Sequence, residues 1–451
     1  NGAVINAYTP ERLAVVHPST PQLIDVADGI WQLAGMSISW PVVIEGEDGL
    51  IIYDTGDNLE EGRHFAGEVA KLSDKPVVAI IYSHAHYTMG ASAFTEGGRD
   101  VEVIGHPMIN RNVTQGGGLG TYFPEITPLQ LARASEQFNN YTPRSGPDAP
   151  IAGIIELKER GFLPVTRPVE DGEELTVAGV KMQFFTRHHS DTDDCLTVWL
   201  PERKAVLNNL FWPNMPNFYT PRGALYRDPF NWIEGLKQIR SLEPELLLST
   251  HTFPVKGQSQ VREHLNLFSD GIAFILDQTL RGILLGLGPD ELRYFIKFPP
   301  HLESFPFLAE SYGELAWYPP YFFNYALGWW NGDAASLHRL HPDDEAGRLV
   351  KLMGGQGMVR EAAEDALGRD EYAWAAQLAT YLLRLDGSDQ AAKNVKAAAL
   401  REMGHRARGS IMRSYALSQA LELEGKVDIP RLIPPSVDQI ALAPPERYLS
   451  R

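Results

Sequence analysis

Two histidines two positions apart, His84 and His86, are the residues of this 451-residue sequence with the clearest capacity for chemistry. They stand in the stretch "AIIYSHAHYTMGAS", residues 79–92, where an apolar run leads directly into them. Imidazole nitrogens bind zinc and other divalent metals. A histidine pair alone is more often structural than metal-binding, so further ligands must come from other parts of the sequence.

Two later segments bring side chains of the same kinds to predicted strand ends. The run "LLLSTHTFPVKG", residues 246–257, ends a strand on His251. Because open α/β sheets bind ligands at the carboxyl ends of their strands, we expect these segments and the histidine pair to meet at one rim. Between two further predicted strands, the run "FFTRHHSDTDDCLTVWL", residues 184–200, carries five ligand-type side chains: His188, His189, Asp191, Asp193 and Asp194.

Each of these residues also has a structural interpretation. His84 and His86 could hold their loop by hydrogen bonds. Loop aspartates usually cap turns, and we expect that role for Asp193. His188 and His189 could lie on the surface.

Composition narrows both the chemistry and the partners. The single cysteine, Cys195, excludes an intrachain disulfide and a thiolate-rich zinc cluster, so a metal must bind to histidine and carboxylate. The net charge of -17, without a concentration of lysine and arginine, argues against a nucleic-acid partner. No apolar run reaches the length of a membrane span, and the first residues lack signal-peptide features. We therefore expect no membrane partner and favour a cytoplasmic over a periplasmic location.

The elements that must position these residues change character along the sequence. From residue 30 to about 288, short β-branched runs alternate with turns and helical stretches, which is typical of a layered α/β domain. The run "VVIEGEDGLIIYDTG", residues 42–56, predicts a hairpin that turns at Glu-Asp-Gly. The glycine-rich residues 113–128 lack phosphate-loop spacing and predict a mobile loop. Further on, the apolar spacing becomes helical, with a helical hairpin over residues 371–404.

The sequence resembles the metallo-β-lactamase fold and, within it, the alkyl sulfatases. The family's leading motif is His-x-His-x-Asp-His, whose first pair falls on His84 and His86, after "YDTG" at residues 53–56. The resemblance extends to "NFYTPRGALYRD", "LDQTLRG", "LGWWNGDAASLH" and "LMGG", in the expected order. It implies a metallo-β-lactamase αββα sandwich over residues 1–288 and an all-helical dimerisation domain over 289–430, followed by a tail, 431–451. The family's third, sterol-carrier-like domain is expected to be missing.

The resemblance also implies a metal site that departs from the family's pattern. The third ligand falls on Asp191 and the last family histidine on His251. Thr88 and Met89 stand where the family has the Asp and the second His of its motif, and neither side chain suits a divalent ion. The Glu that completes the second site aligns near Asn209, or on Leu210 if the alignment shifts by one residue. We therefore expect one divalent metal, zinc with iron or manganese as alternatives, on four residues: His84, His86, Asp191 and His251.

The remaining site roles follow from the same resemblance. With one metal, the attacking water needs a base, for which Asp191, Asp194 and His189 are the candidates. Asn217 and Arg222 fall where the family contacts the sulfate group, although Arg222 could instead be a structural ion-pair partner. Asn209 is expected to contribute to substrate binding.

These expectations define one function and two rivals. We expect a metal-dependent hydrolase of a small organic substrate with a good leaving group. An alkyl or aryl sulfate is the family default, and an activated aryl ether or another ester is the alternative. The first rival is a catalytically degenerate subunit that pairs with an intact paralogue. The second is a module that binds anionic surfactant-like molecules without turnover.

A homodimer, or a hetero-oligomer with a related subunit, is the expected assembly. Residues 290–425 resemble the family's dimerisation segment, and apolar aromatic surface of this kind marks protein interfaces. Four aromatic side chains are expected to be exposed there: Trp317, Tyr321, Trp329 and Trp330.

Overall fold

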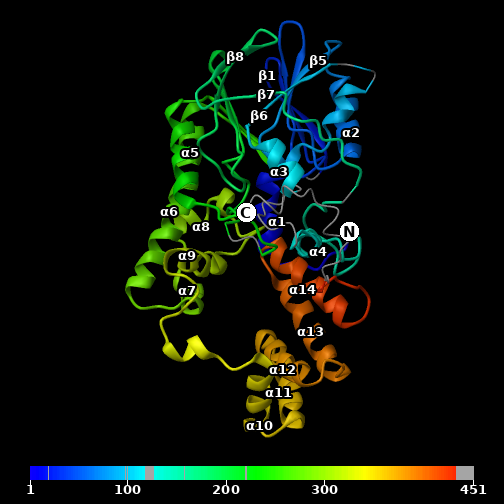
Figure 1. Cartoon of the computed structure of the whole chain (residues 1–451), viewed down its shortest axis with the longest axis vertical. Helices are drawn as coiled ribbons and strands as arrows, with labels where there is room; N and C mark the ends of the chain where they lie inside the picture. The colour runs from blue at the N-terminus through cyan, green and yellow to red at the C-terminus, as the bar shows by residue number, and fades with distance from the viewer. Residues whose placement is uncertain are drawn as a thin grey trace.

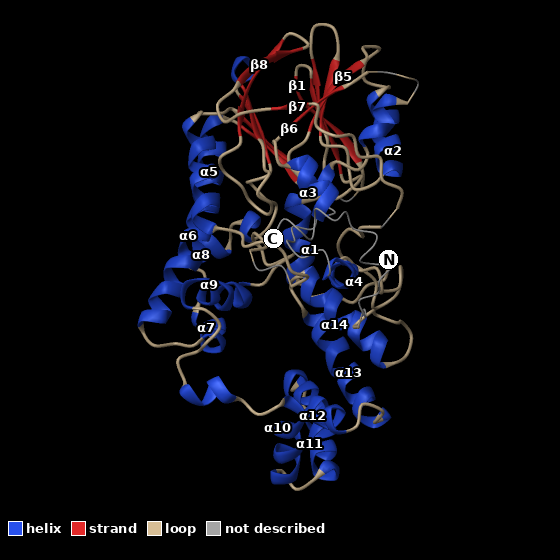
Figure 2. Ribbon diagram, in the orientation of Figure 1, coloured by secondary structure: helices blue, strands red, loops and turns tan. Residues whose placement is uncertain are grey.

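The computed structural model describes residues 1–18, 20–96, 98, 100–116, 126–156, 158–218 and 221–432. Two β-sheets lie at one end of an elongated molecule, and a group of helices extends from them (Figure 1, Figure 2). None of the described helices combines the length and the apolar character needed to cross a membrane.

The first sheet has seven strands in chain order. Strands β1 to β4 pair antiparallel, and β4 to β7 pair parallel. The predicted hairpin is its β3–β4 pair, with Glu45 opposite Leu50. The strands are β1 (Gln22–Ala27), β2 (Ile30–Ala34), β3 (Val42–Glu45), β4 (Leu50–Tyr53), β5 (Val77–Ile81), β6 (Glu102–Gly105) and β7 (Arg167–Pro168).

The second sheet has six strands in the order β13-β12-β11-β10-β9-β8. Only the β11–β12 pair is parallel, so the strand ends after β11 and β12 point to the same rim. The strands are β8 (Glu174–Val177), β9 (Val180–Phe185), β10 (Thr197–Leu200), β11 (Ala205–Asn208), β12 (Leu246–Ser249) and β13 (Thr252–Lys256).

Alternation of side chains along the strands builds the layers. On β4, Ile51 and Tyr53 pack between the sheets, while Leu50 and Ile52 face helix α2 (Leu59–Val69) on the outside. Val206 on the outer face of the second sheet packs against α5 (Pro229–Ser241) and α6 (Gln258–Leu284). Because successive side chains of a strand point to opposite faces of the sheet, one buried strand contributes to the core on both faces. The predicted αββα sandwich is therefore confirmed.

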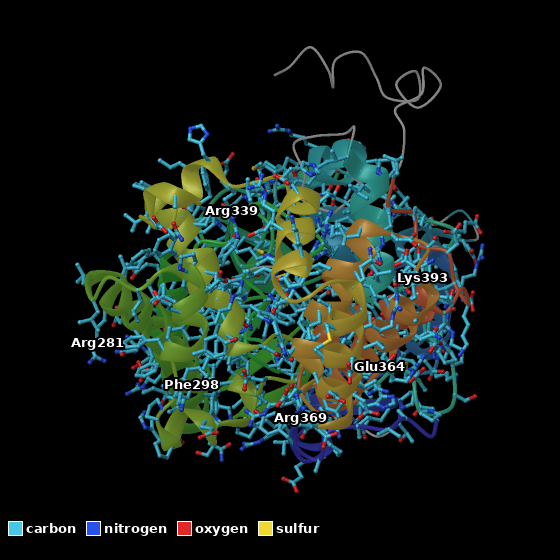
Figure 3. The ribbon with its side chains drawn as sticks, turned by 90° about the horizontal axis from the view of Figure 1, so that it is seen from below. Arg281, Phe298, Arg339, Glu364, Arg369 and Lys393 are labelled. Carbon is cyan, nitrogen blue, oxygen red and sulfur yellow. The ribbon has the colours of Figure 1, made fainter. Side chains whose placement is uncertain are left out.

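The helical part follows the sandwich. Helices α10 to α13 pack around a small core of alanine, leucine and valine, and the predicted helical hairpin is the α12–α13 pair. Seen from below, Arg281 and Phe298 lie at one side of this end of the molecule and Lys393 at the other (Figure 3). The helices are α7 (Pro289–Phe295), α8 (Pro300–Glu303), α9 (Tyr318–Leu327), α10 (Pro342–Leu352), α11 (Gln356–Gly368), α12 (Tyr372–Leu385), α13 (Gln390–Arg406) and α14 (Ser410–Leu423).

Helix α14 returns to the sandwich. It packs against α4 (Thr127–Gln137), and Arg413 donates hydrogen bonds to the carbonyls of Val4, Pro147 and Ala149. Helix α1 (Tyr8–Val16) lies close to the start of the chain and packs against residues 306–308. Helix α3 (Ile109–Gly116) extends into the segment for which we expected a mobile loop, so that loop begins later than predicted. Residues 117–125 of the loop, and residues 433–451 of the expected tail, lie outside the described part.

Candidate metal centre and its cavity

The end of β5 presents His84 to the interior of the site. His84 is fully buried, and its Nδ1 lies 2.7 Å from the Ser83 hydroxyl, while Ser83 N donates to Asp54 Oδ1 at 2.8 Å. Burial lowers the pKa of His84 well below its ordinary value, although the charge of Asp191 opposes this shift. With Nδ1 engaged by Ser83, Nε2 is the nitrogen left to face a ligand.

His86 and Asp191 complete a close group with His84. His86 Nδ1 lies 3.1 Å and His84 Nε2 lies 3.8 Å from Asp191 Oδ2. All three ligand atoms are within 4.8 Å of one another, and in the described chain no other set of three His, Cys, Asp or Glu side chains meets this condition. Two imidazoles and one carboxylate, with a position left for water or substrate, are a ligand set of catalytic zinc sites. These residues fit the metal that the sequence predicts.

The charge of Asp191 suits the same role. Burial raises the pKa of Asp191, but the attraction of His84 and then His86 outweighs it and holds this pKa well below its ordinary value. The side chain is therefore a carboxylate even though it is almost fully buried. A buried carboxylate with two imidazole rings beside it favours a cation at their centre.

Asn209 orients the group. Its Nδ2 donates to Asp191 Oδ1 at 2.8 Å and lies 3.4 Å from His84 Nε2. Its Oδ1 accepts from the Thr250 hydroxyl at 2.7 Å, which fixes the direction of the amide. The contacts show Asn209 holding the carboxylate, and the substrate-binding role expected for it stays a prediction.

The two positions that depart from the family's motif, Thr88 and Met89, make contacts of their own. The hydroxyl of Thr88 donates to Ala85 O at 3.2 Å. Met89 is 5% exposed and packs in the apolar cluster of Phe65 between the first sheet and α2. Met89 also lines the cavity, where it offers a thioether in place of an imidazole.

His251 lies in the same cavity but outside the group of three. Its Nε2 is 3.4 Å from the Tyr87 hydroxyl and its Nδ1 is 3.1 Å from Ile38 O. Its ring also packs edge-on against Trp212. A ligand role for His251 stays a prediction.

The expected bases Asp194 and His189 do not line the cavity. Asp194 is fully buried and accepts hydrogen bonds from Asn112 Nδ2 at 2.9 Å, from Ala85 N at 3.4 Å and from the Thr192 hydroxyl. These are the contacts of a carboxylate that supports the turn after His84. His189 N donates to Asn231 of α5 at 2.8 Å. Catalytic roles for both stay predictions, and the geometry favours structural ones.

A second polar group in the cavity carries positive charge. Asn217 and Arg222 line it as expected, together with Arg227, which the sequence analysis missed. Both arginines are buried; burial lowers the pKa of Arg222, and the charge of Arg227 lowers it further. Arg227 donates to Asn217 O, and Asn217 Oδ1 has no hydrogen-bond partner among the described residues. Two buried guanidinium groups thus line the cavity, and guanidinium is the group that proteins most often use to bind anions.

The sequence contains a signal from which Arg227 could have been identified. It lies in the same quoted segment as Arg222, five residues further on, but no motif position singled it out. The signal is the presence of a second arginine five residues after Arg222, in a segment already expected to contact an anion.

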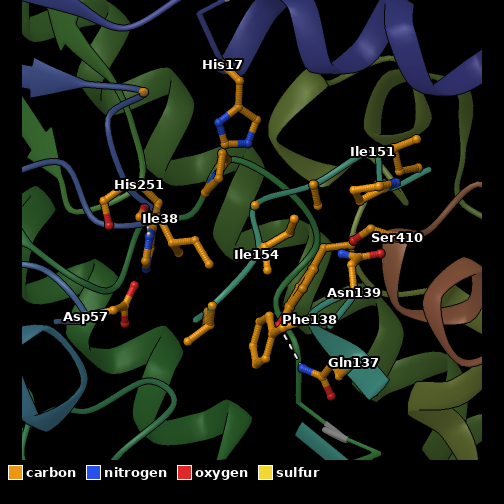
Figure 4. A pocket seen from close by; sticks show the side chains of 18 of the residues that line it. His17, Ile38, Asp57, Gln137, Phe138, Asn139, Ile151, Ile154, His251 and Ser410 are labelled. Carbon is orange, nitrogen blue, oxygen red and sulfur yellow. Dashed lines mark hydrogen bonds between the residues drawn. The ribbon is translucent and has the colours of Figure 1, made fainter. Parts of the chain in front are cut away.

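The cavity joins these groups to an apolar wall. Its volume is about 1320 Å³, and it opens between the sandwich, α4 and the start of α14. Figure 4 shows His251 and Asp57 projecting into it, together with Ile38, Phe138, Ile151 and Ile154. A substrate with a polar head and an apolar body matches this division.

Two family patterns match the chain. The metallo-beta-lactamase superfamily matches residues 34–207, and the alkyl sulfatase dimerisation family matches residues 288–426.

Several characterised proteins are similar over most of the chain. A linear primary-alkylsulfatase of Pseudomonas sp. (strain ATCC 19151) is 33% identical over 398 residues, which are 86% of this chain and 74% of that protein. An alkyl/aryl-sulfatase of Saccharomyces cerevisiae is 27% identical, over 89% of this chain and 64% of its own length. An (R)-specific secondary-alkylsulfatase of Pseudomonas sp. is 26% identical, and the chain spans 62% of it.

The solved structures agree on the fold. The stereoselective inverting sec-alkylsulfatase of Pseudomonas sp. superposes with a TM-score of 0.84 over 95% of this chain and 69% of that one. Its sequence identity is 23%, so this likeness concerns the architecture alone.

Proposed function

Because the chain belongs to the alkylsulfatase family of metallo-β-lactamase-fold hydrolases, we propose that it hydrolyses sulfate esters of small organic alcohols with the help of one divalent metal. One observation carries this proposal. Two members of the close group, His86 and Asp191, line the same cavity as the buried guanidinium groups of Arg222 and Arg227. A metal-binding group and an anion-binding group that face one cavity suit a sulfate ester better than a neutral substrate.

The side chains divide the work. His84, His86 and Asp191 would hold the metal, which lowers the pKa of a bound water or polarises a substrate oxygen when present. Arg222 and Arg227 would bind the sulfate oxygens. The apolar wall around Ile38 and Phe138 would hold the organic part and exclude water from it. Zinc is the first expectation for the metal, with iron or manganese as alternatives.

The number of metal ions follows from what replaces the second set of ligands. Thr88 bonds its own turn, Met89 fills the apolar core and Asn209 donates an amide hydrogen to Asp191. None of these three groups offers a free anionic or imidazole donor. We therefore expect one ion per chain.

The test combines metal analysis with turnover. The purified chain should hold about one equivalent of a divalent metal and release sulfate from a medium-chain alkyl sulfate or from 4-nitrophenyl sulfate. Removal of the metal with a chelator should abolish turnover, and its return should restore it. Metal binding without turnover of any sulfate ester, while an aryl ether or carboxylic ester is cleaved, would replace this substrate class with the alternative one.

The replaced ligands Thr88, Met89 and Asn209 also support a second candidate, a catalytically degenerate subunit that pairs with an intact paralogue. This candidate predicts no bound metal and no turnover by the purified chain. Metal content therefore separates the two candidates before any substrate is tried.

A further inference from the structure

Asp57 and Glu61 are two acidic residues of the cavity that the proposed centre does not use. Both line it together with His86, Asp191 and His251. Asp57 is partly exposed, and it directly precedes Asn58, the residue that caps the start of α2. Neither residue was singled out by the sequence, because the pattern Asn-x-x-Glu reads there as a helix start.

The backbone places Asp57 beside the two positions that depart from the family's motif. Thr55 N donates to Tyr87 O at 2.9 Å, Gly56 pairs with Thr88, and Met89 N donates to Gly56 O at 3.1 Å. Gly56 has a φ of 91°, and a Cβ there would lie 2.8 Å from Glu61 Oε2, so glycine permits this close approach. The next side chain, Asp57, thus enters the cavity next to the turn that no longer carries ligands for a second ion.

Hydrogen bonds hold the Glu61 carboxylate in a fixed position next to the backbone of Asp57. Its Oε2 accepts from Asp57 N at 2.9 Å and from the Ser37 hydroxyl at 2.7 Å, and its Oε1 accepts from Asn58 Nδ2 at 3.0 Å. Three converging donors suit a carboxylate anion. The residue after Ser37, Ile38, contacts His251 through its carbonyl, so one loop joins the acidic pair to the rest of the site.

The surroundings of Asp57 favour its protonated form. Although part of its side chain is accessible from the cavity, loss of solvent around Asp57 raises its pKa well above the ordinary value, the charges of Glu61 and then Asp54 raise it further, and the nearby Ser37 hydroxyl lowers it. Asp57 is then a carboxylic acid with a proton to give. Of the other titratable or charged groups, Tyr87 on η1 (Ala85–Tyr87) interacts with Asp57. The same cavity is lined by His17, His86, Glu156, Lys158, Arg160, Asp191, Arg222, Arg227, His251 and Tyr312.

We propose that Asp57 is the proton donor to the leaving group in this site and that Glu61 is its positioning residue. The inference rests on the proposed sulfate-ester hydrolysis. A water oxygen bonds to sulfur, and the bond between sulfur and the ester oxygen breaks, with its electron pair staying on the ester oxygen. The Asp57 proton moves to that oxygen and yields the alcohol. One proton of the attacking water passes to Asp57 and restores the acid, so the products are alcohol and hydrogen sulfate. In this scheme a proton neutralises the leaving oxygen where a second cation would otherwise stand.

The test compares leaving groups in Asp57→Asn. An alkyl alkoxide is a poor leaving group that needs a proton, whereas 4-nitrophenolate leaves without one. We expect kcat for a medium-chain alkyl sulfate to fall about 100-fold or more, the usual contribution of a positioned acid. We expect kcat for 4-nitrophenyl sulfate to fall less than about tenfold, and the metal content to equal that of the parent.

Glu60→Gln is the matched control. Glu60 lies on the same turn of α2, is exposed outside the cavity and pairs with Lys158 at 2.9 Å. Its loss removes one carboxylate charge from the same segment and should leave both turnover numbers unchanged.

A second variant, Glu61→Gln, is measured by the pH dependence of turnover, which would not shift if Glu61 only stabilised the fold. Loss of the Glu61 charge in Glu61→Gln lowers the pKa of Asp57, so the fall of alkyl sulfate turnover at high pH should begin at a lower pH than in the parent. An unmoved alkaline limb, equal losses on both substrates in Asp57→Asn, or loss of its metal would each overturn the inference. If the parent itself turns over neither ester, the proposed function fails and the inference falls with it.

Discussion

His84 and His86 present different ring nitrogens to Asp191, because the backbone turns through η1 between them. His84 offers Nε2 with Ser83 behind it, and His86 offers Nδ1. Each nitrogen should contribute a bond to the metal. We expect His84→Ala and His86→Ala to lower metal content and turnover together, by roughly tenfold or more in metal affinity for each, while the circular dichroism spectrum stays that of the parent.

A suitable control for these variants is His64→Ala, since His64 is exposed on α2 and does not line the cavity. It should change neither quantity. A double variant of His84 and His86 that keeps its metal would show that these residues are not the ligands.

Asp54 carries a pH dependence that can be isolated. Burial raises its pKa to about 7 from 3.8, against the hydrogen bond from Ser83. The folded state therefore binds this proton more tightly than the unfolded state. The free energy of unfolding contributed by Asp54 is fully present below about pH 4 and is lost as pH rises to about 7.

The corresponding variant is Asp54→Asn, whose amide is neutral at every pH and can still accept from Ser83 N. Its backbone φ of 66° is one that asparagine tolerates. Between pH 5 and pH 8, we expect the parent to lose about 3 kcal/mol more stability than the variant, at about 1.4 kcal/mol per pKa unit. Thermal midpoints at both pH values measure this, and equal slopes in parent and variant would refute it.

At the scale of the element, the turn from β5 through η1 decides how many ions the site holds. We expect the combined variant Thr88→Asp, Met89→His and Asn209→Glu to bind a second ion, because carboxylates and imidazole would again face one another. Without metal it should melt well below the parent. The change at Met89 removes an apolar side chain from the core, and the change at Asn209 places a second anion beside Asp191.

Turnover of the native substrate by this variant should fall, since the second ion changes the charge around the bound water. Metal stoichiometry and turnover on the native substrate and on a medium-chain alkyl sulfate measure the outcome. Two bound ions with full native turnover would contradict a one-ion mechanism. Gain of alkyl sulfate turnover from an inactive parent would identify the parent as the degenerate subunit.

The elements differ in how far their sequences foretold them. The apolar runs of β4 and β5 predicted strands, and the apolar spacing along α12 predicted a helix. These predictions are possible because the burial of one side of an element repeats within a few residues of sequence. The run of β5 placed His84 after a strand end, and the run of β9 did the same for Asp191. Two features of the site could not be predicted in this way: His251 stands outside the group of three, and Asp194 accepts a hydrogen bond from Asn112. Both depend on side-chain packing between segments that are far apart in sequence. Asp57 escaped notice because its significance lies in the pairing of its neighbour Gly56 with Thr88 and not in its own sequence context.

At the scale of the whole molecule, the helical end exposes aromatic surface. Trp329 is 69% and Trp330 39% exposed, as expected, while Trp317 and Tyr321 are half-buried, Tyr321 because it stacks on Tyr226. The match to the alkyl sulfatase dimerisation family covers this region. We expect a dimer, with a second copy or a related subunit on this surface.

Light scattering at micromolar concentration measures the assembly. The parent should have twice the mass of one chain, and the double variant Trp329→Ser, Trp330→Ser should shift toward the monomer. Phe230→Ser is the matched control, because Phe230 is 61% exposed but lies on α5 of the sandwich. A monomeric parent would contradict this assembly.

The hydrogen bond from Arg413 to the carbonyl of Val4 spans 409 residues of sequence. Ribosomal synthesis is directional, so this contact cannot form until α14 has left the ribosome, whereas both sheets are complete much earlier. The sandwich and its histidines can therefore fold first, with the wall formed by α4 and Ser410 added last. During that interval the cavity is open to water along its apolar side. A nascent chain that stalls within α13 would therefore hold His84, His86 and Asp191 together while the part of the cavity wall that α14 supplies is still absent.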